Sequence, residues 1–355
     1  MITDLPGLRQ RLGDCLGTSI ERLQVLDTGW ETTIYEFSIG AKSLRTPGLP
    51  VASPLVLRLY DGTGAEDKAA REGRIFFHLA RAGYPVPRPY VCEPARATLG
   101  APFLVMDRVA GGPLFSATNF TRAFKTFSLG FLAFVRAQVR LHRLPVGGPD
   151  SDDLPKAHLA PPIAPTAPLL ERMLGMIAER VAGGALPGLI DALAALRERA
   201  DRYRTAPDAI VHLDYHPQNV IVRGMRVTGV IDWVSADRGD RHLDAATTSA
   251  ILATSAMDRP RWMRDNRAGN SLRALFASLY FPAYHALAPM ELDRFRYCQA
   301  VAALFRLSTF GMMRTRGPAS VGFHPEAIAN VTPDVVRLLT RYAARKSGVA
   351  VTLDR

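Results

Sequence analysis

Three polar residues at a characteristic spacing constrain this chain more than any other feature: Asp214, Asn219 and Asp232. The first two lie five positions apart in the segment HLDYHPQN, and the third follows the apolar run VTGVI. Residues 209–213 predict a buried strand that leads into the first segment, and residues 220–231 predict a hairpin that leads to Asp232. The pattern therefore predicts that two carboxylates and one carboxamide meet at the ends of short strands.

These residue types suit phosphoryl transfer. A transferring phosphoryl group needs positioning, a divalent cation and a group that orients the attacking hydroxyl, but little covalent help. Mg²⁺ prefers oxygen ligands, so Asn219 and Asp232 are candidate metal ligands, and Asp214 would accept the proton of an acceptor hydroxyl. Asp and Asn are also common in turns and caps, so the prediction depends on the flanking strands as much as on the spacing.

Length and composition predict a cytoplasmic protein with a large core. The chain has 355 residues, of which 48% are hydrophobic, and this favours two lobes over one. No apolar run is long and uncharged enough to span a membrane, and the first residues lack the pattern of a signal peptide. Cys15, Cys92 and Cys298 match no metal or disulfide pattern, so we expect buried thiols in a reducing compartment.

The net charge of +11 raises the question of a nucleic-acid or membrane partner. The basic residues are mostly arginines that occur singly, without a Lys/Arg run or a basic stretch interleaved with aromatic residues. We therefore expect a solvated arginine-rich surface, and neither nucleic acid nor a membrane as a partner. A salt-dependent interaction with RNA or DNA would contradict this expectation.

Periodicity divides the chain into a strand-rich part, residues 1–107, and a mainly helical part, residues 108–355. Short alternating or apolar runs predict strands at residues 23–27, 33–39, 55–60 and 103–106. Residues 67–82 carry the long helical pattern of the first part. Residues 146–167 are rich in Pro, Gly and Ala and predict a loop or insertion in the second part. This order of elements predicts an α+β fold.

Several further segments match one family. The strand PLVLRL, the pair RE at residues 71 and 72, and the runs YPVPRP and GAPFLVMDR accompany the HLDYHPQN and IDW motifs. Together they resemble the aminoglycoside phosphotransferase family, the small-molecule branch of the protein-kinase-like fold, from Leu23 to Ala246. The resemblance implies a bilobal fold: a small antiparallel-sheet N-terminal lobe with one long helix, and a larger, mainly helical C-terminal lobe. It also implies ATP and Mg²⁺ as cofactors.

The resemblance assigns nucleotide-binding residues as well. Arg58 stands where the family carries its phosphate cation, and Glu72 on the long helix would hold that cation in place. The backbone from Met106 through Asp107 to Val109 corresponds to the hinge that meets an adenine edge. Ordinary interpretations also exist, since Arg58 could be an outward residue of a half-buried strand and Glu72 a charge on the helix surface.

The glycine-rich loop is the least similar element, because it has one glycine where protein kinases have three. Gly29 and Thr32 are the residues there that would approach phosphate. The resemblance also implies that His212 braces the catalytic loop. We expect His142 to be structural, and Asp244 to cap or anchor the helix that follows it.

The acceptor is expected to be a small molecule. Leu213 stands where regulated protein kinases carry an arginine, and the run from Asp232 to Asp244 is too short for an activation segment and a peptide platform. Arginines are frequent beyond this run, namely Arg259, Arg261, Arg264, Arg267 and Arg273. A polycationic aminoglycoside calls for acidic residues instead. We therefore favour a neutral or anionic alcohol, sugar or natural product.

Two other hypotheses stay open beside an ATP- and Mg²⁺-dependent small-molecule kinase. An aminoglycoside or choline-like kinase would share the catalytic residues, and the aromatic stretch at residues 280–285 could form a cage for a choline-like cation or simply pack in the core. A non-catalytic kinase-like module would bind nucleotide without transferring phosphate. Nucleotide binding without ATP turnover would identify such a module.

Overall fold

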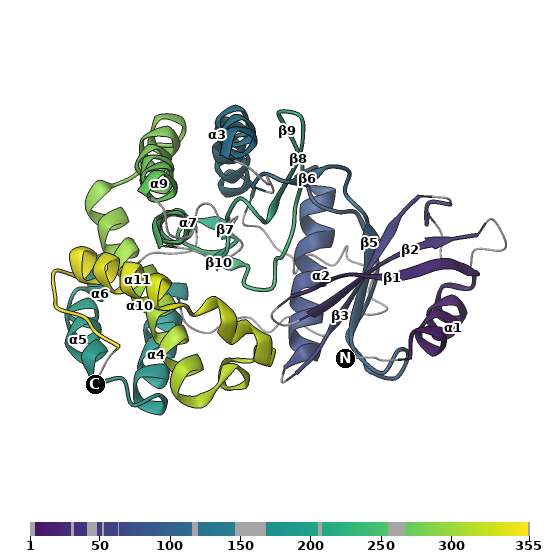
Figure 1. The fold of residues 1–355 in the computed structure, drawn as a ribbon, viewed down its shortest axis with the longest axis horizontal. Coiled ribbons are helices and arrows are strands. Elements are labelled where there is room, and N and C mark those ends of the chain that lie inside the picture. Colours follow the sequence, from purple (N-terminus) through teal and green to yellow (C-terminus); the bar gives the residue numbers. More distant parts are fainter. Residues whose placement is uncertain are drawn as a thin grey trace.

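A five-stranded antiparallel sheet forms the N-terminal part of the computed structural model (Figure 1). Structure is described for residues 4–29, 32–40, 48–51, 53–62, 64–115, 120–145, 168–204, 208–254 and 267–353. The strands, in the spatial order β1-β2-β3-β5-β4, are β1 (Ile20–Thr28), β2 (Thr32–Ile39), β3 (Leu55–Tyr60), β5 (Phe103–Asp107) and β4 (Pro89–Glu93). All four strands predicted for this part lie in this sheet.

β3 is the centre of the sheet, and all six of its residues are buried. Its odd-numbered leucines belong to the apolar cluster formed with α1 (Leu5–Leu16), while Val56 and Tyr60 belong to the main core. Side chains alternate along a strand, so Arg58 lies on the same face as Val56 and Tyr60. The alternation therefore directs Arg58 toward the helical part of the molecule.

Two helices flank the sheet. α2 (Ala65–Arg81) lies between the sheet and the helical part (Figure 1) and matches the helix predicted at residues 67–82. α1 was not among the predicted elements, although ordinary helix signals are present. Asp4 accepts a hydrogen bond from the N–H of Gly7 at 2.9 Å, and Gly17 ends the helix with a φ of 66°.

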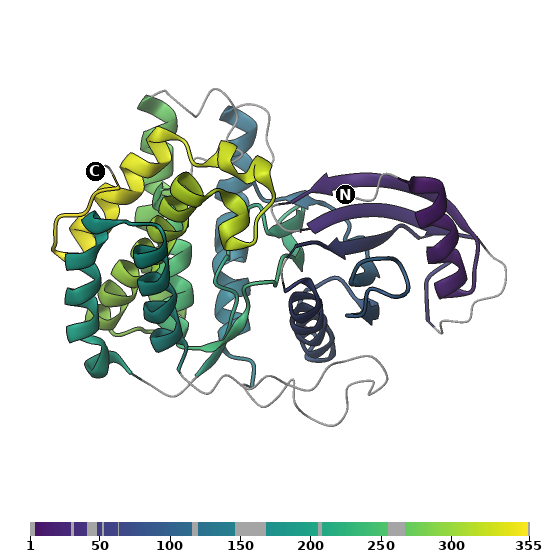
Figure 2. The same cartoon turned by 90° about the horizontal axis from the view of Figure 1, so that it is seen from below.

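The C-terminal part is mainly helical, as predicted (Figure 2). Its helices are α3 (Phe120–His142), α4 (Leu169–Gly183), α5 (Ile190–Glu198), α6 (Ala200–Tyr203), α7 (Arg241–Thr254), α9 (Arg267–Leu287), α10 (Leu292–Arg316) and α11 (Pro333–Ser347), with short 3-10 helices at Pro187–Leu189, Pro318–Val321 and Pro325–Asn330. α10 packs against α4, α7 and α11. Among the described residues, no helix is long and apolar enough to cross a membrane. The fold is thus the predicted α+β, kinase-like arrangement of two parts.

Short strands frame the loop that carries Asp214. They are β7 (Ala209–Val211), paired with β10 (Asp237–Gly239), and a three-stranded sheet of β6 (Gly112–Pro113), β8 (Val220–Arg223) and β9 (Arg226–Val230). β8 and β9 are the predicted hairpin. The strand predicted at residues 209–213 ends earlier, at Val211, because Leu213 adopts a positive φ of 60°.

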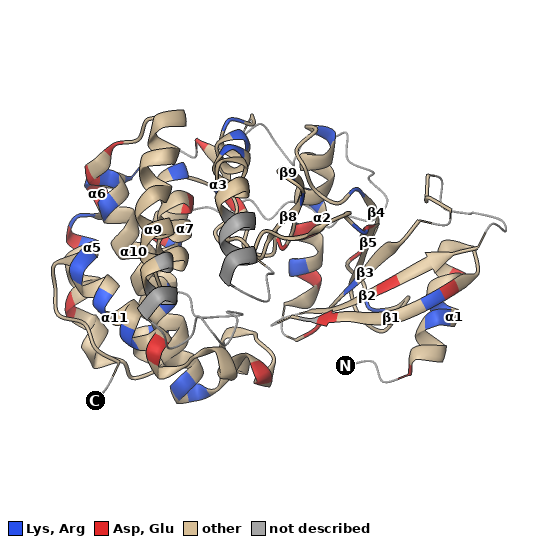
Figure 3. Ribbon diagram, turned by 45° about the horizontal axis from the view of Figure 1, so that its top comes forward, with Lys and Arg blue, Asp and Glu red and all other residues tan. Residues whose placement is uncertain are grey.

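Some predictions concern residues outside the described ranges. These include the loop or insertion at residues 146–167 and three of the arginines, Arg259, Arg261 and Arg264. The side chains of Arg267 and Arg273 are not described either. Figure 3 shows Lys and Arg, and Asp and Glu, scattered over the helices of the C-terminal part. The arginine argument about the acceptor and the boundary between residues 107 and 108 therefore stay predictions.

Candidate active site

The loop between β7 and β8 carries Asp214 in a backbone conformation that needs support. Leu213 has a φ of 60°, a left-handed conformation that costs a non-glycine residue on the order of 1 kcal/mol. Asp244 provides the support, because its Oδ1 accepts the N–H of Leu213 at 2.5 Å and that of His212 at 3.1 Å. This bend leaves the Asp214 side chain one-third exposed at the end of the strand.

His212 braces the same loop from inside. The ring is fully buried, its Nδ1 accepts the N–H of Asp214 at 3.3 Å, and its Nε2 lies 3.0 Å from the Ile231 carbonyl oxygen. Burial lowers the pKa of His212, so near pH 7 the ring is neutral and donates its Nε2–H to Ile231. The ring thereby ties the Asp214 loop to the strand before Asp232, which fits a bracing role.

Asp244 supports the catalytic loop. Of the two structural roles expected for it, capping the following helix is wrong, and anchoring that helix is found. α7 begins at Arg241, so Asp244 lies in the first turn of that helix. Its Oδ2 accepts a hydrogen bond from Gln138 Nε2 at 3.0 Å and lies 2.8 Å from His142 Nε2. Burial would raise the pKa of Asp244, but the hydrogen bonds and charge of its partners, His142 first, hold it below the ordinary value. One buried carboxylate therefore joins α3, α7 and the loop.

The aromatic stretch at residues 280–285 contributes its tyrosines to the core behind Asp244. Tyr280 donates to Gln138 Oε1 at 2.5 Å, and the Tyr284 hydroxyl lies 2.5 Å from His142 Nδ1. Both tyrosines are fully buried. The stretch therefore supports the loop network from behind, and its two tyrosines do not form a surface cage.

Three nitrogen-bearing side chains face the Asp214 carboxylate. Asn219 Nδ2 donates to Oδ2 at 3.4 Å. His216 Nε2 lies 3.5 Å from Oδ2, and Nη1 of Arg306, on α10, lies 3.9 Å from Oδ1. Burial would raise the pKa of Asp214, but His216, and to a lesser degree Arg306, hold it below the ordinary value. Asp214 is thus a carboxylate at neutral pH and able to accept a proton. Arg306 was missed by the sequence analysis, because it lies in no motif.

The hairpin places Asn219 next to Asp232. The Asn219 carbonyl accepts the N–H of Ile231 at 2.9 Å, so Asp232 follows at the next residue. Asn219 Nδ2 donates to the Asp214 carbonyl at 3.0 Å, which leaves its amide oxygen for another partner. The Asp232 side chain is 41% exposed. Two neighbouring side-chain oxygens of this kind fit Mg²⁺, which usually takes one or two protein groups together with substrate phosphates.

Arg58 joins the sheet to this pair of residues. Its Nη2 lies 2.6 Å from Asp232 Oδ1, and its Nε lies 3.3 Å from Glu72 Oε2. Burial opposes the charge of Arg58, but Glu72 and Asp232 together raise its pKa above the ordinary value. Glu72 is fully buried on α2 and also accepts the Trp233 N–H at 2.8 Å and the Tyr60 hydroxyl. The structure therefore places the two predicted partners together and adds Asp232 as a third.

Glu72→Gln is expected to lower the free energy of unfolding by about 1–3 kcal/mol, because a buried carboxylate that accepts two hydrogen bonds and pairs with Arg58 loses its charge and becomes partly a donor. Urea denaturation would measure this change. Glu66→Gln is the matched control on the same helix, since Glu66 is 46% exposed and pairs only at the surface with Arg96. Its effect should stay within about 0.5 kcal/mol. Equal losses in the two variants would contradict the role assigned to Glu72.

The predicted hinge residues lie at the end of β5, which includes Met106 and Asp107, and just beyond it at Val109. The Asp107 N–H donates to the Arg88 carbonyl at 2.9 Å, and the Asp107 carboxylate accepts the Tyr90 hydroxyl at 2.7 Å. The Asp107 side chain and N–H are therefore already engaged, and contact of this segment with a nucleotide stays a prediction. Met106 is buried in the main core. Val109 lies so close to Gly229 on β9 that a Cβ atom added to this glycine would be 2.9 Å from the Val109 side chain.

Gly29 and Thr32 close the turn between β1 and β2. The Gly29 N–H donates to the Thr32 carbonyl at 2.9 Å, and the Thr32 side chain is 2% exposed. The two residues between them lie outside the described ranges. The structure thus brings Gly29 and Thr32 together, and their approach to phosphate stays a prediction.

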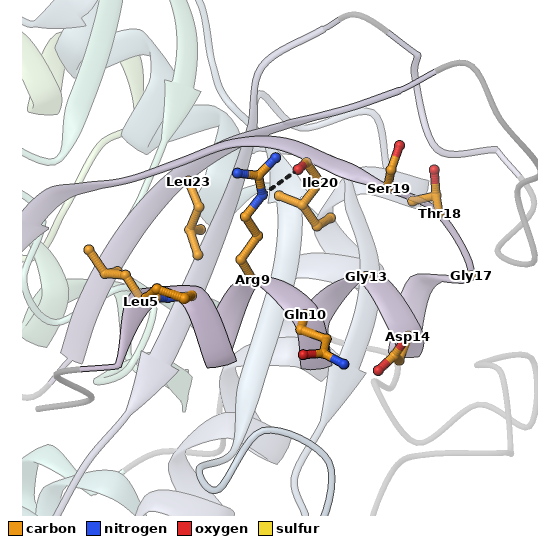
Figure 4. A pocket seen from close by; sticks show the side chains of 11 residues that line it. Leu5, Arg9, Gln10, Gly13, Asp14, Gly17, Thr18, Ser19, Ile20 and Leu23 are labelled. Atoms are coloured by element: carbon orange, nitrogen blue, oxygen red, sulfur yellow. Dashed lines mark hydrogen bonds between the residues drawn. The ribbon is translucent and has the colours of Figure 1, made fainter.

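A shallow surface hollow lies elsewhere, between α1 and the start of β1 (Figure 4). Arg9 crosses it and donates from Nε to the Ile20 carbonyl at 2.6 Å, with Leu5 and Leu23 at one end. None of its lining residues belongs to the group around Asp214. The hollow is therefore separate from the candidate active site.

The fold and the junction of Asp214, Asn219, Asp232 and Arg58 define the kinase-like class of protein. Within that class the chain belongs to the phosphotransferase enzyme family, whose family model, APH, matches residues 23–290. Membership confirms the resemblance found in the sequence. Comparison with curated proteins gives no significant match.

Solved structures share the fold at low sequence identity. A thermostable mutant of aminoglycoside phosphotransferase APH(4)-Ia, in a ternary complex with AMP-PNP and hygromycin B, has a TM-score of 0.63 and 15% identity, covering 96% of this chain and 98% of that one. Macrolide 2'-phosphotransferase MphH from Brachybacterium faecium has a TM-score of 0.53 and 15% identity, covering 93% and 99%. At such identities the similarity shows the fold alone.

Proposed function

We propose that this protein is an ATP- and Mg²⁺-dependent O-phosphotransferase that moves the γ-phosphate to a hydroxyl of a small molecule. The observation that carries the proposal is the contact between Arg58 and Asp232. A buried cation from the sheet and a carboxylate from the helical part lie 2.6 Å apart, one hairpin from Asp214. Phosphate oxygens with a bound cation could separate this pair and satisfy both charges. The AMP-PNP complex of APH(4)-Ia supports ATP as the donor.

Asp214 is proposed to accept the proton of the acceptor hydroxyl. The acceptor oxygen forms a bond to the γ-phosphorus, the bond from that phosphorus to the bridging oxygen breaks, and ADP leaves. Phosphoryl transfer is largely dissociative, so the proton is given up late and a weak base suffices. The pKa of Asp214, held below the ordinary value first by His216, suits this role.

Asn219 and Asp232 are proposed to hold Mg²⁺. Within the described ranges no cluster of three or more Asp, Glu, His or Cys side chains could hold a metal ion. The nucleotide phosphates would therefore complete the coordination, as is common for Mg²⁺. When bound, the ion neutralises charge on the phosphates. Arg58, held by Glu72, would grip the same phosphates from the sheet side.

The remaining nucleotide contacts are proposed from the resemblance. The backbone of Met106, Asp107 and Val109 would meet the adenine edge, and Gly29 and Thr32 would approach the phosphates. A neutral or anionic alcohol is the favoured acceptor. An aminoglycoside or choline-like acceptor is the alternative within the same reaction, and a non-catalytic nucleotide-binding module is the alternative of another class.

A phosphate-transfer screen tests the proposal. The purified protein would be incubated with ATP, MgCl₂ and a panel of sugars, hydroxy acids, amino alcohols, macrolides and aminoglycosides, and products would gain the mass of one phosphoryl group. ATP hydrolysis without acceptor would be followed in parallel. Transfer or hydrolysis that requires Asp214 supports the enzyme. Nucleotide binding with neither activity would support the non-catalytic module instead.

Asp232→Asn is expected to remove the tightening of ATP binding by Mg²⁺. Loss of a charged ligand is worth about 1.5–3 kcal/mol, so the Kd of ATP measured with MgCl₂ should rise about 10- to 100-fold. Calorimetric titration with and without MgCl₂ would separate the metal effect from the rest. Asp201→Asn, at an 88% exposed side chain, is the control and should bind as the wild type does. An undiminished Mg²⁺ effect in the Asp232 variant would refute the metal assignment.

A further inference from the structure

Arg306 reaches the candidate base from outside the region that the family model matches. That match ends at residue 290, and α10, which carries Arg306, begins at Leu292. Helix packing against α4, α7 and α11 holds α10 in the middle of the helical part. The cation beside Asp214 is therefore a feature of this chain that the family match does not supply.

The Arg306 guanidinium lies near Asp214 but forms no hydrogen bond with it. The two side chains approach to 3.9 Å, which is too long for a hydrogen bond, and Arg306 Nε is buried with no hydrogen-bond partner among the described residues. The side chain is 17% exposed, and the Phe310 ring lies 5.8 Å from its guanidinium carbon. A guanidinium carries five donors in a planar fork that suits carboxylate or phosphate oxygens. Arg306 thus has capacity for an anionic ligand.

The position of Arg306 beside Asp214 limits where an anionic ligand would lie. An acceptor hydroxyl that gives its proton to Asp214 must come within about 2.7 Å of the carboxylate. When the hydroxyl contacts Oδ1, the atom 3.9 Å from Arg306, this puts Nη1 within about 7 Å of the reacting oxygen. That span fits an acidic group a few bonds from the hydroxyl. An ammonium group at the same place would meet a like charge instead.

We propose that Arg306 selects the acceptor, by binding an anionic oxygen group, carboxylate or phosphate, that lies a few bonds from the hydroxyl to be phosphorylated. This inference rests on the proposed phosphotransferase function and names the charge of its substrate. The same side chain disfavours polycationic acceptors, because their ammonium groups would be repelled by the Arg306 guanidinium.

Three matched acceptors test the proposal: 3-hydroxypropanoate, 1,3-propanediol and 3-amino-1-propanol. They have similar length and share a primary hydroxyl, and they differ in the charge at the other end. Initial rates of phosphoryl transfer from ATP would be followed by mass. We expect the wild type to prefer the carboxylate over the diol about 10- to 100-fold, as for a charge-assisted hydrogen bond, and to use the amine least. Arg306→Gln should reduce that ratio to within about threefold, and Arg306→Lys should keep part of it.

The ratio separates selection from mere positioning of Asp214. A positioning residue would lower ATP hydrolysis and all three transfers by one factor and leave the ratio unchanged, which would overturn the proposal. Arg296→Gln, at an exposed arginine on the same helix, should keep both rate and ratio. If Asp214-dependent turnover of ATP occurs without preference for the carboxylate, this inference fails while the phosphotransferase stands. If no Asp214-dependent turnover occurs at all, both fail.

Discussion

Replacing Asp214 by asparagine is expected to lower the rate of phosphate transfer about 10²- to 10⁴-fold. The amide has the size of the carboxylate but cannot take the acceptor proton. The pKa of Asp214 lies below its ordinary value, chiefly because His216 outweighs the effect of burial. The base therefore stays charged throughout the neutral range, and Asp214 should not limit activity between pH 5 and 8. Initial rates of ADP formation and of product mass would measure both effects.

The transfer rates of Asp214→Asn and the wild type can be compared only if the nucleotide site of the variant is intact. ATP affinity of the Asp214 variant should stay close to the wild type, since Arg58, Glu72 and Asp232 are unchanged. Asp191→Asn alters an exposed carboxylate on α5 and should retain the wild-type rate. A rate within about threefold of the wild type in Asp214→Asn would remove the base assignment, because the loss expected of a general base is far larger.

Asp244→Ala is expected to lower the free energy of unfolding by about 3–5 kcal/mol, the largest stability effect foreseen in this protein. Its carboxylate accepts two backbone N–H groups of the catalytic loop and faces the Gln138 and His142 side chains, all in the core. Removing it leaves these donors buried without a partner. Activity should fall as well, because Leu213 loses the contact that holds its left-handed backbone. Urea denaturation and transfer rates would measure the two losses.

The contribution of the Asp244 carboxylate should also be visible in how the free energy of unfolding depends on pH. The pKa of Asp244 is lowered in the folded protein, since hydrogen bonds from His142 and Gln138 outweigh burial. Its contribution to stability is therefore complete above the unfolded value of about 3.9 and is lost as the pH falls below that value. Asp244→Asn should lose stability less steeply than the wild type below about pH 4. A wild-type slope in this variant, or a large loss in the exposed Asp191→Ala control, would argue against the assignment.

Local patterns predicted the elements that depend on neighbouring residues. The sheet strands, α2 and the β8–β9 hairpin follow from alternation, periodicity and turn residues within short windows. α1 shows that a local signal can also be missed, because Asp4 and Gly17 mark its ends as plainly as at any other helix. The end of β7 could not be predicted from propensity, since Leu213 takes a positive φ only because Asp244 holds its N–H.

Other parts of the site depend on residues far apart in the chain. Arg58 and Asp232 are separated by 174 positions, and Gln138 and Asp244 by 106. Pairing Arg58 with Glu72 needed the family resemblance as well as alternation, because alternation alone suits an outward arginine. The sequence suggested that Asp244 caps or anchors the following helix, but its contact with the catalytic loop could not be inferred, since His212 and Leu213 lie 32 and 31 positions away. Nothing in the sequence marks Arg306.

By itself, the sequence predicted the reaction class, because the spacing of Asp214, Asn219 and Asp232 on a loop and hairpin is a short-range property of the chain. It also indicated the family and the two-part fold. Only the tertiary structure decided how these groups are held and charged. A carboxylate's pKa and a guanidinium's free donors depend on burial and on partners from distant helices, as Asp244 and Arg306 show. Such partners come from packing, and no local pattern records them.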